Sequence, residues 1–117
     1  MKFVKWSEKN WDDKVGYSKK ILLSDLDIWT KWVHVQEVKI KAHEVAKAHY
    51  HKIQTEMFYF LTDNWYRIVN WEKIQPKVWD VLMIKPDDVH EVVNETDTDY
   101  IYLAFKTDYA QDDLIWC

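Results

Sequence analysis

Short apolar segments separated by turn-forming residues recur along the whole chain. Valine, isoleucine and aromatic side chains dominate these segments, as is typical of β-strands. Turn signals such as Thr62-Asp63-Asn64 and Pro86-Asp87-Asp88 lie between them. We expect strands at residues 19–24, 32–40, 45–51, 55–62, 65–70, 72–75, 80–85, 89–94 and 99–106. Many short strands at this spacing predict an all-β sandwich or barrel.

Two of the expected strands have a pattern that assigns their faces. In the segment 99–106, Ile101, Leu103 and Phe105 share one face, and Tyr100, Tyr102 and Ala104 share the other. The segment 55–62 is apolar on both faces, with Glu56, Phe58 and Phe60 expected inward and Met57, Tyr59 and Leu61 outward. The outward row needs cover, either from a second sheet or from another chain.

A group of histidines and one glutamate has the composition of a metal site. His49 and His51 are two residues apart, so on a strand they share a face. Glu56 has the opposite parity, and therefore a bend, bulge or change of strand must bring it to the same point. His90 follows the Pro86 turn. Three imidazoles and one carboxylate suit Zn, Fe, Mn, Ni or Cu, and they do not suit Ca or Mg. A lone histidine pair on a strand is more often an ordinary surface or core feature.

These motifs resemble those of the small single-domain cupins, over roughly residues 21–105. The first cupin motif is matched at His49, His51 and Glu56, and the second at Pro86, His90 and Asn94. The chain departs from the family pattern where glycines are usual, with His43, Asp63 and Asp88 in their places. The spacer before His90 is also one residue shorter.

The resemblance implies one cupin domain over residues 1–117, folded as a double-stranded β-helix, or jelly-roll barrel. It implies one divalent transition metal at the barrel mouth, held by His49, His51, Glu56 and His90. Similar cupins act on small molecules as isomerases, dioxygenases or lyases. The alternative is a non-catalytic cupin that binds or senses a small ligand such as a sugar. Small cupins commonly pair, so a homodimer is expected.

Other classes of function find little support in the composition. The net charge of −4 provides no basic field for nucleic acid. No apolar run approaches the ~20 residues of a membrane span. The N-terminal segment MKFVKWSEKNWDDK is charged throughout, unlike a signal peptide, and the single cysteine, Cys117, has no internal partner. We therefore expect a cytoplasmic protein.

The remaining polar candidates are expected to have ordinary packing or surface roles. His34 is interpreted as a satisfied core or surface residue, and His43 as a loop residue. The acidic pairs Asp12-Asp13 and Asp112-Asp113 lie near the termini and are interpreted as solvated charge. The same ordinary roles are expected of Gln54, Tyr59, Arg67, Asn94 and Tyr102.

Tryptophan is abundant where glycine is scarce. The chain has eight tryptophans and one glycine, whereas average usage would give about eight glycines. Similar cupins carry turn glycines at the positions of Trp65, Trp71 and Trp79, and Trp29 and Trp32 also resemble loop glycines. Some uncultured bacterial lineages read UGA as glycine, while other codes read it as tryptophan. Our hypothesis is that these tryptophans are mis-decoded glycines; the alternative is that they are genuine.

Overall fold

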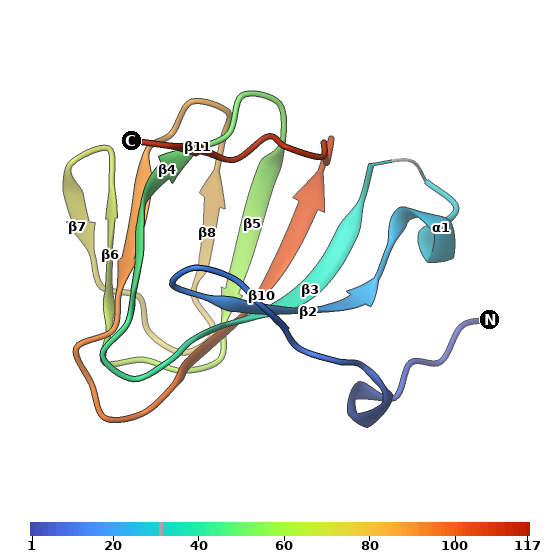
Figure 1. Cartoon of the computed structure of the whole chain (residues 1–117), viewed down its shortest axis with the longest axis horizontal. Helices are drawn as coiled ribbons and strands as arrows, with labels where there is room; N and C mark the ends of the chain where they lie inside the picture. Colours follow the sequence, from blue (N-terminus) through green and yellow to red (C-terminus); the bar gives the residue numbers. More distant parts are fainter. Residues whose placement is uncertain (31) are drawn as a thin grey trace.

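The computed structural model describes residues 1–30 and 32–117. Its strands form two antiparallel sheets that face each other (Figure 1). The larger sheet has, in spatial order, β1 (Asp12–Asp13), β2 (Ser18–Leu23), β3 (His34–Ile40), β10 (Tyr100–Thr107), β5 (Thr55–Phe60) and β8 (Val81–Ile84). The smaller has β11 (Ile115–Trp116), β4 (Val45–Tyr50), β9 (His90–Val93), β6 (Tyr66–Val69) and β7 (Glu72–Ile74).

The all-β prediction is confirmed, because every strand expected from the sequence is present. The elements that the sequence did not predict are short: β1, β11, the 3₁₀ turn Trp6–Glu8 and the helix α1 (Asp25–Ile28). A two-residue strand or a single helical turn carries too little periodicity to be detected. No helix among the described residues is long and apolar enough to cross a lipid bilayer.

The core lies between the inward faces of the two sheets. As predicted, residues alternate along β10, and the buried face carries Tyr100, Tyr102 and Ala104. Phe58 and Phe60 of β5 join this core, with the Phe58 and Tyr102 rings packed edge to face at 5.0 Å. Each buried aromatic side chain of this kind contributes roughly 1.5–3 kcal/mol of hydrophobic stabilisation. The alternation continues past the core to the barrel mouth, where Glu56 occupies the buried position on β5.

The outer face of the larger sheet carries a continuous apolar surface. Strand register places one row of side chains across four strands: Val35, Phe105, Met57 and Met83. A second row contains Leu103, Tyr59 and Val81. These side chains are only partly buried or are exposed. We call this surface the outer apolar face. The N-terminal 3₁₀ turn covers part of the same side over β2 and β3, where the Trp6 indole donates to Glu37 at 2.7 Å and its ring packs on the buried Lys20.

Four tryptophans occupy backbone positions that favour glycine. Trp29, Trp32, Trp71 and Trp79 have φ values of 64°, 67°, 67° and 77°, in the left-handed region that bulky residues rarely adopt. All four side chains are exposed. Asn70 and Trp71 form the two-residue connection between β6 and β7, and both have positive φ, as a type I′ turn requires. The prediction of turns at Trp71 and Trp79 is therefore confirmed.

The turn assignment of Trp65 is wrong. Its side chain is only 2% exposed, its indole N–H donates to the Thr62 carbonyl at 3.0 Å, and its ring stacks on Tyr100. The positive φ at this bend belongs to Asn64 instead. Asn64 makes the turn at the surface, so the next residue points back into the barrel and becomes part of the core.

Candidate metal centre

Three buried histidines meet at the end of the smaller sheet. His49 of β4 lies directly opposite His90 of β9 in the strand register, and His51 follows the end of β4. An irregularity in the β4–β9 pairing between Ala46 and His49 accompanies this arrangement. The three ligand nitrogens lie within 4.8 Å of one another. The expectation that the imidazoles of His49 and His51 converge is therefore confirmed, and His90 joins them.

A hydrogen bond to the backbone orients each of the three rings. The Nδ1 atoms of His49, His51 and His90 lie 2.7, 2.8 and 3.0 Å from the carbonyl oxygens of Lys47, Asp113 and Asp88. Because a carbonyl oxygen only accepts, each Nδ1 must carry the proton. A neutral imidazole protonated at Nδ1 has its lone pair on Nε2, the atom that each ring directs toward the other two. This is the tautomer that a metal-ligating histidine adopts.

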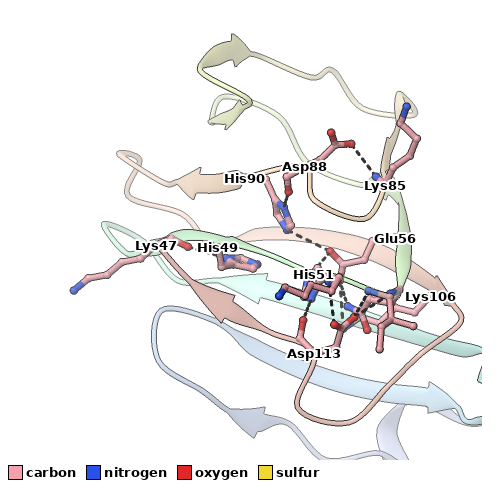
Figure 2. Close-up of polar contacts among 12 residues, drawn as sticks. Lys47, His49, His51, Glu56, Lys85, Asp88, His90, Lys106 and Asp113 are labelled. Carbon is pink, nitrogen blue, oxygen red and sulfur yellow. Dashed lines mark hydrogen bonds and ion pairs between the residues drawn. The ribbon is translucent and has the colours of Figure 1, made fainter.

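Glu56 reaches the same point from the opposite sheet (Figure 2). Its Oε1 is held by Gln54 at 3.3 Å and by Lys106 at 3.3 Å. Its Oε2 lies 3.4 Å from the Nε2 atoms of both His51 and His90. The predicted change of strand between the histidines and Glu56 is present, since Glu56 lies on β5 after the turn that follows His51.

The 3.4 Å separations suit ligands that share a cation. A charge-assisted hydrogen bond is usually ~2.7–2.9 Å long. Two ligand atoms at about 2.1 Å from a tetrahedral metal ion are separated by about 3.4 Å. Lone pairs on Nε2 and a carboxylate oxygen repel each other unless a positive charge lies between them. The donor set and its spacing therefore fit a transition metal ion.

The surroundings of the site keep His49 neutral and Glu56 ionised. Burial beside His90 lowers the pKa of His49 to about 3, so its ring is neutral at pH 7. Burial alone would raise the pKa of Glu56, but Lys106 and the rings of His51 and His90 hold it well below its ordinary value. The centre thus offers a neutral His49 imidazole and an ionised Glu56 carboxylate together.

Asp113 corrects the interpretation of the pair Asp112-Asp113 as solvated charge. Asp113 is 7% exposed, and its carboxylate accepts hydrogen bonds from the backbone N–H groups of Lys52, Ile53 and Gln54 at 2.9, 3.0 and 2.9 Å. Its own carbonyl accepts the proton of His51 Nδ1. The C-terminal segment therefore fixes both the turn between β4 and β5 and the orientation of one candidate ligand.

The other sequence candidates lie outside the histidine cluster. His34 stacks on Tyr109 at 3.9 Å, and the exposed ring of His43 pairs with Asp97 at 2.7 Å. Asn94, matched to the second cupin motif, donates to the carbonyls of Ile40, Lys41 and Thr98, and so it ties two loops together. Tyr59 faces outward on the outer apolar face. The ordinary roles expected of these residues agree with their contacts.

Two cations line the cavity beside the histidine cluster. Lys106 was not predicted, and Arg67 was expected to be ordinary packing; both face the cavity together with Glu56, Phe58 and Tyr102. Strand parity could have found Lys106, because it continues the inward series of Tyr102 and Ala104. This inner cavity measures about 40 Å³. It adjoins a larger open hollow of about 550 Å³, which shares Tyr17, His51, Lys106 and Leu114 with it.

No protein-family model and no curated protein matches the sequence. Solved structures do match. A predicted oxalate decarboxylase from Thermotoga maritima superposes with a TM-score of 0.80 at 20% identity, over 91% of this chain and 98% of that chain. KdgF from Halomonas sp. gives 0.79 at 19% identity, over 97% of both chains. Pac13, described as a unique nucleoside dehydratase, gives 0.77 at 10% identity, over 100% of this chain and 91% of its own. These likenesses show that the fold is the cupin β-barrel.

Proposed function

We propose that this cupin-fold chain holds one divalent transition metal ion through His49, His51, Glu56 and His90, and that it acts on a small molecule beside that ion. The observation that carries the proposal is the convergence of three imidazoles, each held through Nδ1 by a backbone carbonyl, on a carboxylate oxygen that lies 3.4 Å from two of their Nε2 atoms. The nitrogen and oxygen donors suit Zn, Fe, Mn, Ni or Cu. Such an ion, when bound, supplies Lewis-acid or oxygen-binding chemistry.

The residues around the centre have separable tasks under this proposal. Lys106 and Gln54 hold one oxygen of Glu56, so the other oxygen stays directed at the histidines. Phe58 and Val92 form an apolar wall that limits water near the centre. The larger hollow, with Lys14 and Lys19 on its rim, gives a small molecule a route to the inner cavity.

The solved structures support an enzyme more than a passive binder. Two of them are a predicted oxalate decarboxylase and a nucleoside dehydratase, and both activities are of the lyase class and act on small molecules. The identities are too low to transfer either reaction. We therefore infer small-molecule chemistry of the lyase, isomerase or dioxygenase kind for this chain, with the reaction to be found by screening.

Metal binding tests the proposal directly. Protein stripped with a chelator and titrated with Zn²⁺ or Co²⁺ is expected to bind about one ion per chain, because the described histidine cluster is a single site. Elemental analysis after gel filtration measures the ratio, and the visible spectrum of the Co²⁺ form reports the coordination number. A ratio near zero with Zn²⁺ and Co²⁺, and in parallel titrations with Fe²⁺, Mn²⁺, Ni²⁺ and Cu²⁺, would refute the proposal.

We also infer that a second copy of the chain covers the outer apolar face. Its two rows cross four strands, and such a face is costly to leave in water. Light scattering at micromolar concentration is expected to give twice the chain mass of 14.3 kDa. Phe105→Glu, in the middle of the face, is expected to give monomers. Leu26→Glu, on α1 outside this sheet, is the control that should leave the dimer intact. A wild-type mass of one chain would contradict the inference.

A further inference from the structure

Arg67 of β6 is a buried cation without a hydrogen-bond partner. Its side chain is 0% exposed, and its Nε, Nη1 and Nη2 atoms have no acceptor among the described residues. A guanidinium stays protonated in proteins, and a buried charge is strongly destabilising unless something pairs with it. The fold therefore keeps five N–H donors inside the barrel that the chain itself does not use.

Aromatic rings stabilise the charge of Arg67, but they contact only the two flat faces of its guanidinium group. The guanidinium carbon lies 4.3 Å from the ring centre of Phe58 and 4.9 Å from that of Tyr102. Cation–π contacts of this kind stabilise the cation, but guanidinium N–H groups point outward in the plane and remain free. The hydroxyls of Tyr100 and Tyr102 lie beside the guanidinium and favour its charged form, but neither meets hydrogen-bond distance and angle with its nitrogens. Burial raises the pKa of both, so neither supplies a negative charge.

Arg67 lines the same cavity as the histidine cluster. The carboxylate that shares this cavity, Glu56, is already paired with Lys106 at 3.3 Å. An anion from outside the chain is therefore the partner that the guanidinium lacks. The cavity of about 40 Å³ admits only a few non-hydrogen atoms, which favours a flat, singly charged group over a tetrahedral dianion.

We propose that Arg67 binds the carboxylate of a small organic acid whose other end reaches the histidine cluster. This assigns a substrate class and rests on the proposed metal function for the role of that other end. The planar fork of a guanidinium matches the two oxygens of a carboxylate, and the apolar walls strengthen the pair by excluding water. Arg67 is a substrate-binding residue in this proposal, and the acid enters through the larger hollow.

The test measures the binding of acetate, glycolate, pyruvate and malonate by calorimetry, in metal-free and zinc-loaded protein. Glycolamide is the uncharged control and inorganic phosphate the tetrahedral one. At least one acid is expected to bind metal-free wild type, and Arg67→Met should weaken it by about 10- to 100-fold, as the loss of a charge-assisted pair does. Metal-free Arg67→Met should be at least as stable to denaturant as wild type, because the substitution removes an unpaired buried charge.

The outcomes separate this proposal from that of the metal centre. An acid that binds wild type and Arg67→Met equally, tighter binding of phosphate, or no binding by any acid would each overturn the role of Arg67. Arg67-dependent binding of an acid by a protein that takes up no metal would support this role and refute the metal centre. If Arg67→Met does not fold, Arg67→Lys replaces it: losing the fork but keeping the charge, it should bind the acid more weakly than wild type.

Discussion

Simultaneous replacement of His49 and His51 by alanine is expected to abolish stoichiometric metal binding. The double variant leaves His90 and Glu56 as the only donors of the set, and two ligands do not hold a transition metal against competing water. Loss of a group that merely supports a ligand already costs ~10–100-fold in metal affinity, so the loss of two ligands should exceed this range. Elemental analysis after gel filtration measures the effect.

A stability measurement distinguishes a lost site from a lost fold. A metal present at 100 times its Kd stabilises the folded chain by about 2.7 kcal/mol. Zinc is therefore expected to raise the denaturation midpoint of wild type and not that of the double variant. His43→Ala is the matched control, since His43 is exposed and pairs with Asp97 outside the cluster; it should bind metal like wild type. Undiminished metal in the double variant would show that these histidines are not ligands.

Replacement of Trp71 and of Trp65 by glycine is expected to change stability in opposite directions. At Trp71 the backbone has φ = 67° and the side chain is 86% exposed. Glycine relieves about 1–2 kcal/mol of left-handed strain there and removes little packing. At Trp65 the ring is buried against Tyr100, and truncating such a side chain costs ~3–5 kcal/mol. The denaturation midpoints of the two variants, compared with that of wild type, show whether each substitution raises or lowers stability.

The same comparison bears on the hypothesis that some tryptophans are mis-decoded glycines. Trp29, Trp32, Trp71 and Trp79 combine positive φ with exposure, as expected for glycine positions, and Trp65 does not. The gene is therefore expected to carry UGA at these four positions. UGG at Trp71 and Trp79, or a loss of several kcal/mol in Trp71→Gly, would end the hypothesis for those sites.

Local patterns in the sequence determined the strands and, in the candidate site, the pairing of His49 with His51. Period two on β5 placed Phe58 inward, and on β10 it put Tyr102 on one face with Tyr100 and Ala104, because alternation depends only on the backbone of one strand. The His49–His51 spacing predicted two rings on one face for the same reason. The Asn70-Trp71 turn could be recognised because Asn70 itself favours the left-handed conformation that the hairpin requires.

Only the tertiary structure decided what stands opposite these residues. Glu56 reaches the histidines from the other sheet, Asp113 holds His51 from 62 positions away, and Lys106 meets Glu56 across paired strands. Trp65 and Trp71 each follow an asparagine, yet one ring is core and the other is exposed. Arg67 differs from a surface arginine only through the aromatic rings that close over it. The alternation along a strand specifies which side chains share a face. The contacts of those side chains, and the free-energy cost of burying them, depend on which other strands the fold packs against that face.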